Sequence, residues 1–502
     1  MYWQAIIPLW VVLFPIFMTP AIFILSKRSE KLRDGLSVLT AVITFFSVAS
    51  LYPFVMEGKT IEYTLFQILP ELGVTVRIDI LSFCLAILSS FVWMMATIYS
   101  LDYMKPEHGK NRYYPVLIFT LGATLGIFFA GDFFTLYVFF ELMSLVSYVL
   151  VIHEETPTAL KAGYKYLIMT IIGGLALFFA IIATFELAGS VSLSKGVLVS
   201  KPSTLAFFAF VCYLIGFGMK AGMFPLHVWL PEAHPVAPSP ASALLSGIML
   251  KTGAYGMLRV LFYVFNIEVV QSARWDLLVA VLAVITILLG SAVALTQFDL
   301  KRRLAYSSIG QMGYVLLGMI LFTEQGLVGD IFHIFSHAFM KSTLFLAAGA
   351  IIWKTGLRNI NDLAGIGRKM PFTMGAFTIA ALAMIGIPPL NGFLSKWTLS
   401  LGALEAGLPI YVVILLISSL LNGLYYLPII IAAFFGGEEQ EHAHGEAQHV
   451  EAGINLRGEA TAKMVIPMVI LGLGCFFLGL FPSNIAYELS LKAAVFLFRG
   501  GM

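Results

Sequence analysis

Long apolar runs, separated by short polar stretches, follow one another along almost the whole chain. A run of about 20 apolar residues is long enough to cross the hydrocarbon core of a membrane as a helix. The pattern predicts about fourteen spans, at 4–25, 34–56, 78–100, 113–130, 132–152, 162–188, 204–230, 240–265, 276–297, 303–322, 328–353, 372–404, 409–434 and 463–490. We therefore expect an all-α polytopic membrane protein without a folded soluble domain.

Composition strengthens this expectation and narrows the function. Hydrophobic residues make up 59% of the 502 residues, charged residues only 12%, and the mean hydropathy is +0.92. Soluble domains average about 25% charged residues. The net charge of +2 argues against nucleic-acid binding, and we find no phosphate-binding loop, nucleophile elbow or haem-attachment motif. We expect no cofactor and no catalytic site in this chain; a redox cofactor, if the function needs one, would belong to a partner.

The distribution of basic residues predicts the orientation. No basic residue precedes the first span, and Lys27, Arg28, Lys31 and Arg33 follow it. A cleaved signal has the reverse polarity, and basic loops stay in the cytoplasm. We expect a multi-pass protein of the cell membrane with its N-terminus outside, and an even number of spans returns the C-terminus to the outside.

Two of the predicted spans carry helix breakers near their middle. Span seven contains Gly222 and Pro225, and span twelve contains Gly386, Pro388 and Pro389. Proline removes a backbone donor and clashes with the preceding turn, so both helices should break. Ordinary proline kinks are the alternative. Because the broken spans are five apart, spans 4–8 and 9–13 are expected to form inverted repeats.

This spacing divides the chain into five parts. They are the first three spans (1–112), the first repeat (113–265), the second repeat (276–434), a hydrophilic His/Glu-rich cytoplasmic loop (435–462), and the last span with a short C-terminus (463–502). We expect the loop to be a solvated linker, with adventitious metal binding as the alternative.

Four lysines stand inside apolar spans, at Lys220, Lys251, Lys341 and Lys396. A charged side chain at mid-membrane depth costs at least about 2.5–3.5 kcal/mol, and a desolvated lysine loses its proton readily. These lysines are therefore predicted to carry protons. Glu141, in an aromatic-rich span, is expected to pair with Lys220; a static structural ion pair is the alternative.

Other ionisable residues extend this set. His333, His337 and Lys341 are spaced four apart and share one helix face, which predicts a polar wire. A metal site needs a third ligand that is missing in this register. Arg259 is always charged and cannot relay a proton, so it should pair or reach an interface.

The proline-rich segment after span seven contains three further ionisable residues, His227, Glu232 and His234. We expect this segment to be a rigid loop that faces the cytoplasm. Its ionisable residues are candidates for proton uptake, and a plain surface role explains them equally well.

Several stretches resemble one family of membrane proteins. They are KAGMFPLHVWLPEAH from Lys220 to His234, PSPASALLS from Pro238 to Ser246, His333 to Lys341, and NGFLSK from Asn391 to Lys396. They are similar to the antiporter-like subunits shared by respiratory complex I, Mrp-type Na+/H+ antiporters and archaeal membrane-bound hydrogenases. The size and Lys396 look most like the D-type Mrp subunit or its hydrogenase-linked counterparts.

The resemblance implies fourteen helices, inverted repeats and external termini. It implies that Glu141 and Lys220 act in a first half-channel, that Lys251 is the link, and that the residues from His333 to Lys341 continue to Lys396 in a second. It further implies a proton-translocating subunit that works with other membrane subunits, and a hydrogenase or reductase arm is a further candidate partner. A Na+-conducting or self-sufficient Na+/H+ antiporter, and a non-transporting scaffold, are the alternatives.

Overall fold

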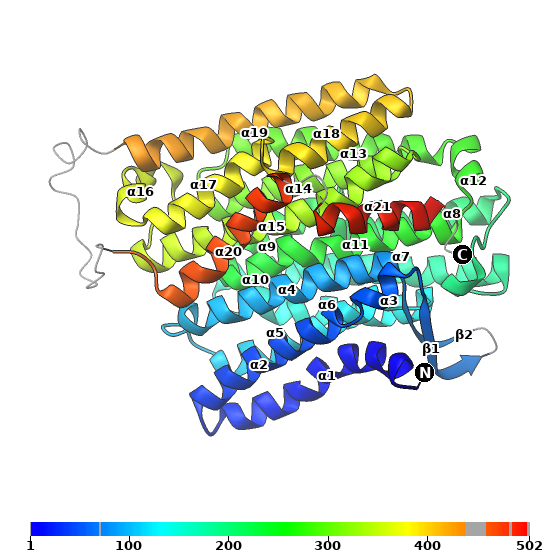
Figure 1. Ribbon diagram of the computed structural model, residues 1–502, viewed down its shortest axis with the longest axis horizontal. Coiled ribbons are helices and arrows are strands. Elements are labelled where there is room, and N and C mark those ends of the chain that lie inside the picture. Colours follow the sequence, from blue (N-terminus) through cyan, green and yellow to red (C-terminus); the bar gives the residue numbers. More distant parts are fainter. Residues whose placement is uncertain (1, 70–71, 437–457, 481–483, 499–502) are drawn as a thin grey trace.

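The computed structural model describes residues 2–69, 72–436, 458–480 and 484–498, and most of them are helical. The helices lie side by side in an elongated bundle, with α1 (Tyr2–Ser26) along one edge and α19 (Pro409–Phe435) along the other (Figure 1). α1 begins and α21 (Ile485–Phe498) ends at the same end of the bundle. This arrangement is the one that an even number of spans requires.

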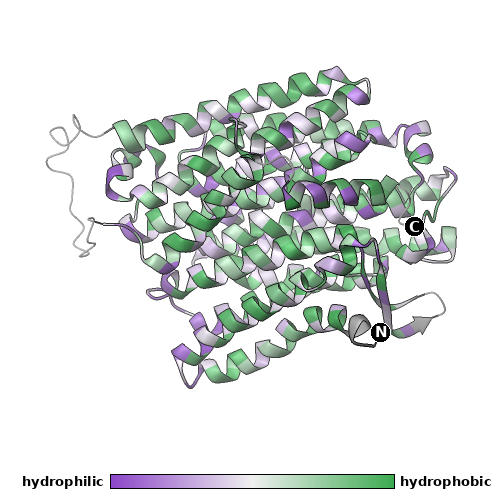
Figure 2. Ribbon diagram, viewed as in Figure 1, coloured by the Kyte–Doolittle hydropathy of each residue, from purple (hydrophilic) through white to green (hydrophobic). Residues whose placement is uncertain are grey.

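Ten stretches of the described chain are long and apolar enough to cross a membrane. They lie in α1, α2 (Glu30–Ala49) with α3 (Tyr52–Met56), α4 (Ile80–Tyr103), α6 (Phe133–Val151), α7 (Pro157–Ala188), α8 (Thr204–Ala221), α13 (Trp275–Leu295), α15 (Glu324–Thr355), α19 and α20 (Ala462–Leu480). Figure 2 shows apolar residues along the lengths of the helices and hydrophilic ones mainly near helix ends and loops. Large apolar side chains such as Phe17 and Leu416 are exposed, as expected at a lipid-facing surface.

The remaining predicted spans are also helical, but they are more polar or are interrupted. They correspond to α5 (Lys110–Phe128), α14 (Leu300–Met319), the run of α10 (Ser239–Leu244), η3 (Leu245–Met249), α11 (Leu250–Arg259) and η4 (Val260–Val264), and the pair α17 (Pro371–Ile385) and α18 (Asn391–Glu405). Each predicted span therefore coincides with one helix or with consecutive helical segments, and the all-α polytopic fold class is confirmed.

Short elements connect these helices. They are η1 (Leu193–Lys195), η2 (Leu226–Trp229), α9 (Leu230–Val236), α12 (Ile267–Ser272), η5 (Ile360–Leu363) and α16 (Ile366–Lys369). Residues 437–457, the greater part of the His/Glu-rich loop, lie outside the described residues. Glu459 near its end accepts a 2.8 Å hydrogen bond from the backbone nitrogen of Phe372, so it caps the start of α17.

A β-hairpin stands between α3 and α4, where only a loop was expected. β1 (Ile61–Leu69) pairs antiparallel with β2 (Leu72–Ile78). The backbone nitrogen of Thr75 donates to Thr135 Oγ1 at 3.0 Å, and that of Arg77 donates to the Phe129 carbonyl at 2.7 Å. These bonds tie the hairpin to the end of α5 and the first turn of α6.

A buried ion pair lies just after the hairpin. Arg259 at the end of α11 donates to the Asp79 carboxylate at 2.7 Å, and both side chains are buried. Asp79 is also the N-cap of α4. The expectation that Arg259 finds a partner is confirmed, and the partner fixes the end of α11 to the start of α4.

Both predicted helix breaks are present. α8 ends at Ala221, and Gly222 adopts a left-handed conformation with φ +74°. α17 ends at Ile385, Gly386 has φ +95°, and α18 begins at Asn391. Glycine reaches these angles without the steric penalty of a side chain. At the first break, Met219 O accepts from Trp229 Nε1 at 3.0 Å. At the second break, the carbonyls of Met384 and Ile385 accept from a lysine side chain.

Candidate functional site

The four lysines predicted from the sequence all lie inside the bundle. Lys220, Lys251 and Lys341 are fully buried and Lys396 is 7% exposed. Each ammonium group makes hydrogen bonds to hydroxyls, carbonyls or a histidine ring, and none forms an ion pair with a carboxylate among the described residues. The lysines are thus solvated by neutral polar groups of the protein.

Lys220 occupies the last turn of α8. Its Nζ donates to Tyr166 OH of α7 at 2.6 Å and to Ser144 Oγ of α6 at 3.1 Å. It also lies 5.0 Å from the centre of the Tyr166 ring. The negative end of a helix dipole favours a cation here, so the break after Ala221 helps to hold this charge.

Glu141 does not contact Lys220 directly, although a direct pair was expected. The Glu141 carboxylate packs against Gly174 of α7, where a Cβ atom would lie 2.4 Å from Oε1. Glu141 Oε1 is buried without a hydrogen-bond partner. Ser144 follows Glu141 by three residues on the same helix face. The Lys220 ammonium donates instead to the hydroxyls of Ser144 and Tyr166, and the Glu141 carboxylate lies beside these groups.

Lys251 lies at the start of α11, directly after the π-helical turn η3. Its Nζ is 2.8 Å from His337 Nδ1 of α15 and 2.7 Å from the Ser246 carbonyl. This contact joins the segment after the first break to α15.

The polar face of α15 carries three of the predicted residues. The His333 and His337 rings stack with centres 6.0 Å apart. Lys341 Nζ donates to the Leu304 carbonyl at 2.9 Å and to the Ser307 hydroxyl, with Tyr426 OH at 3.4 Å. The one-face arrangement expected for His333, His337 and Lys341 is therefore seen in the structure.

Lys396 is held by the carbonyls that the second break exposes. Its Nζ donates to Met384 O at 2.7 Å, Ile385 O at 3.0 Å and Ser419 Oγ at 3.0 Å. The C-terminus of α17 thus faces a positive charge, as the helix dipole favours.

Lys396 and His333 share two neighbours. Tyr314 stacks on the His333 ring with centres 5.4 Å apart, and its own ring lies 5.3 Å from Lys396 Nζ. His333 Nδ1 is 2.9 Å from the hydroxyl of Ser395, the residue before Lys396. The structure therefore brings α15 and the second break together.

The candidate uptake residues lie between α8 and α10. His227 is 7% exposed, whereas His234 is fully buried, stacks on Phe345 and has no hydrogen-bond partner on either ring nitrogen among the described residues. Glu232 contacts Lys165 of α7. The expectation of a surface loop does not hold for His234, because α9 folds back against the bundle.

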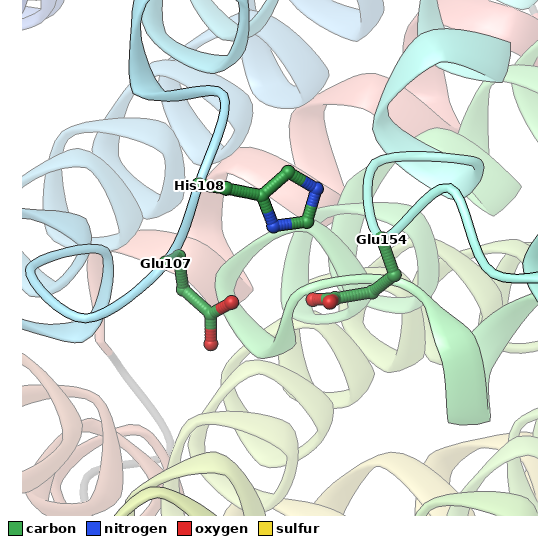
Figure 3. A group of neighbouring side chains, drawn as sticks. All are labelled: Glu107, His108 and Glu154. Atoms are coloured by element: carbon green, nitrogen blue, oxygen red, sulfur yellow. The ribbon is translucent and has the colours of Figure 1, made fainter.

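A cavity of about 480 Å³ opens near this segment, and Glu107, Glu154, Ser239, Lys301 and Arg358 are among its lining residues. Glu107 and Glu154 face each other beside His108 (Figure 3), and one ligand atom of each lies within 4.8 Å of the others. Burial and the charge of Glu154 raise the pKa of Glu107. Because Lys301 and Arg358 share the cavity, this acidic group is balanced by cations.

The hydroxyl partners of the lysines were not predicted. Ser144, Tyr166, Ser307 and Ser419 belong to residue types that are frequent in apolar helices, so their presence gives no signal. Position offered a partial clue, because Ser395 precedes Lys396 and Ser144 lies one turn from Glu141.

The bundle and its buried lysines define a polytopic membrane protein that holds ionisable groups at membrane depth. Residues 130–422 match the family model described as NADH:quinone oxidoreductase/Mrp antiporter, TM, and residues 70–114 match the N-terminus of chain 5 of NADH-ubiquinone oxidoreductase (complex I). The chain belongs to this family of antiporter-like membrane subunits, and the resemblance seen in the sequence is confirmed.

Individual relatives agree with this assignment. NADH-quinone oxidoreductase subunit N of Desulforudis audaxviator is 35% identical, and the match covers 95% of this chain and 96% of that protein. The D-type subunit of the Na(+)/H(+) antiporter of Alkalihalophilus pseudofirmus is 30% identical, with 84% and 83% covered. A chain of the Mrp complex from a Dietzia species has the same fold, with a TM-score of 0.88, 23% identity and 99% and 98% covered.

Proposed function

We propose that this chain is a proton-translocating subunit of a larger membrane complex. The observation that carries the proposal is the 2.8 Å contact between Lys251 and His337, which joins the two broken-helix halves of the bundle. A lysine and a histidine in contact can exchange a proton directly, because the ammonium donates and an unprotonated imidazole nitrogen accepts. The two halves correspond to the proposed repeats, residues 113–265 and 276–434.

In the first half, Lys220 is the proton donor and Glu141 controls it. The Glu141 carboxylate attracts the Lys220 ammonium electrostatically and so helps to hold it in place. A movement that separates α6 from α8 removes this support and the Ser144 bond together. Lys220 then releases its proton toward Lys251 through water, since no hydrogen bond joins these two lysines in the described structure.

In the second half, the proton passes from His337 along α15. His333 delivers it to Lys396 by way of Ser395, and Lys341 extends the same face toward the cytoplasmic end of α15. The return of Glu141 to the side of Lys220 restores proton uptake. His227, Glu232 and His234 are the proposed uptake residues on the cytoplasmic side, with both chain termini outside.

The partners are other membrane subunits, as in the complexes to which the relatives belong. The complex is either an Mrp-type cation/proton antiporter or an ion-pumping hydrogenase or reductase related to complex I. No cofactor is assigned to this chain.

The test is transport by the whole complex in proteoliposomes. Lys220→Ala should abolish proton movement while the complex still assembles, and Glu141→Gln should do the same. Lys161→Ala, which removes an exposed lysine of α7, is the matched control and should transport normally. Unchanged transport by Lys220→Ala would refute the proposal in favour of a non-transporting scaffold.

Sodium movement is the second candidate, because one relative belongs to a Na(+)/H(+) antiporter. Sodium is bound by several oxygen ligands, as other hard cations are, and four lysines along the axis would repel it. If sodium-driven pH change by the purified chain alone were seen, it would favour a self-sufficient antiporter.

A further inference from the structure

One buried acid on α15 has no place in the route described so far. Asp330 is fully buried, and neither of its carboxyl oxygens has a hydrogen-bond partner among the described residues. It forms no ion pair there either. An ionised carboxylate in such surroundings is so costly that the group takes up a proton instead. An ionisable residue inside the membrane is a functional candidate by default.

The position of Asp330 on its helix links it to the polar face. At 3.6 residues per turn, Asp330, His333, His337 and Lys341 fall within an arc of about 80° on α15. Asp330 precedes His333 by three residues, which makes the two side chains neighbours on the helix surface. His333 uses Nδ1 for Ser395 and leaves Nε2 without a partner among the described residues.

The packing around Asp330 shows where it stands along the membrane normal. His333 stands in one layer with Tyr314 of α14 and Lys396 of α18. One turn further along the same helices, Asp330 meets Gly318 of α14, where a Cβ atom would lie 2.8 Å from the Asp330 Cβ. Leu399 of α18 contacts the neighbouring Gly329. Tyr314, His333 and Lys396 are thus the titratable groups on the three elements beside it.

The direction of this turn is outward. Asp330 is six residues after the first residue of α15, a rise of about 9 Å. In the proposed orientation this end of α15 faces the outside. Asp330 therefore stands between His333 and the external surface, whereas Lys396 lies to the side of His333.

We propose that Asp330 is an additional proton-binding site that connects His333 to the external face, as a route out of the polar axis that does not use Lys396. The carboxylic acid receives a proton from the His333 ring and releases one toward the outside, so the number of protons bound is unchanged after each passage. Gly318 provides the space for the side chain. This inference rests on the proposed proton-translocating function.

The experiment is proton flux in proteoliposomes of the whole complex. Asp330→Asn keeps the shape of the side chain and cannot release a proton. Because the Lys396 branch stays open, we expect the flux to fall by about half in Asp330→Asn and by about tenfold or more when Asp330→Asn is combined with Lys396→Ala. Asp330→Glu should retain most of it. Ser342→Ala removes a buried hydroxyl, unpartnered in the described structure, from another face of α15 and should transport normally.

The outcomes separate the two proposals. Normal flux in Asp330→Asn, with Lys220→Ala inactive, would overturn the role of Asp330 and leave the proposed function standing. Equal loss in Asp330→Asn and Asp330→Glu together with a lower melting temperature would show a structural role. Normal flux in both Asp330→Asn and Lys220→Ala would overturn the role of Asp330 and the proposed proton-translocating function together.

A second measurement does not depend on transport. The infrared spectrum of the wild-type protein should contain the carbonyl band of a protonated carboxylic acid that is missing from Asp330→Asn. An identical spectrum for the two proteins would overturn the proposal even if the variant transports poorly.

Discussion

Lys251 of α11 and His337 of α15 are joined by a contact of 2.8 Å between Nζ and Nδ1. These residues are 86 positions apart in the chain, and they meet because α10 and η3 pack along α15. Within the described structure, this contact links a lysine beyond the first break directly to the polar face of α15. Removing this contact should therefore lower proton transport strongly.

His337→Ala should break proton transfer between the halves. A positioned proton-transfer group typically contributes about 10²–10⁴-fold in rate, so we expect transport by the complex to drop by about 10²-fold or more. Ser336→Ala changes the adjacent buried residue and should have little effect. Equal activity of the two variants would mean that protons pass between the halves elsewhere.

The two hydroxyls beside Lys220 should act as a unit. Tyr166→Phe removes the 2.6 Å bond and leaves Ser144 as the acceptor. A hydrogen bond to a charged group is worth about 1.5–3 kcal/mol, so Tyr166→Phe should slow transport by about tenfold or more. Tyr166→Phe combined with Ser144→Ala should be as inactive as Lys220→Ala. A double variant with the activity of Tyr166→Phe alone would exclude a role for Ser144.

Gly386 should not tolerate a side chain. A non-glycine residue in a left-handed conformation costs about 1–2 kcal/mol, and a Cβ atom here would lie 3.1 Å from Lys396 Cδ. Gly386→Ala should therefore lower both stability and transport. Gly375→Ala, in the helix that Gly386 ends and with no atom within 4 Å of the added group, is the control. Thermal melting and flux of both variants provide the comparison.

The buried pair of Asp79 and Arg259 should matter for stability rather than for transport. Removing one partner of a buried ion pair costs about 3–5 kcal/mol because the other charge is left unpaired. Asp79→Asn should therefore melt well below the wild type. Combining it with Arg259→Met should restore part of the loss. Glu62→Gln, which removes the more exposed partner of Arg77, should change stability by less than about 1 kcal/mol.

His153, in the loop after α6, should make stability depend on pH. Burial and the Arg112 guanidinium lower its pKa to about 4, from an ordinary value of about 6.5. A depressed pKa means that this contribution to stability is complete above the ordinary value and is lost as the pH falls toward 4. The loss amounts to about 3 kcal/mol. Between these pH values, the melting temperature of His153→Gln should fall less steeply with decreasing pH than that of the wild type. An equal fall in the two proteins would contradict the lowered pKa of His153.

The sequence was a good guide to the spans and to the charged residues. The apolar runs and the prolines are local signals, and both breaks lie where the prolines predicted them. The four lysines were visible because charge inside an apolar run is rare. The hairpin at 61–78 was missed because alternating strands are short beside membrane spans, and the search for long apolar runs passed over them.

The partners of the charged groups could not be predicted in the same way. The ammonium of Lys220 meets hydroxyls instead of Glu141 because the close approach of α7 along Gly174 sets the position of the carboxylate. Such contacts depend on how three helices pack, and a one-dimensional pattern does not contain that information. The burial of Asp330 against Gly318 is of the same kind.

The second helix break also depends, during insertion into the membrane, on a helix that is synthesised after it. Met384 O accepts from Lys396 and also from Asn422 Nδ2 at 3.0 Å, and Ser419 binds the same lysine. Both Asn422 and Ser419 belong to α19, which the ribosome makes after α17 and α18. Until α19 enters the bilayer, the broken segment has an incomplete set of hydrogen bonds and a lysine without one of its acceptors. A ribosome stalled before residue 419 would thus hold an insertion intermediate that a membrane chaperone or protease could recognise.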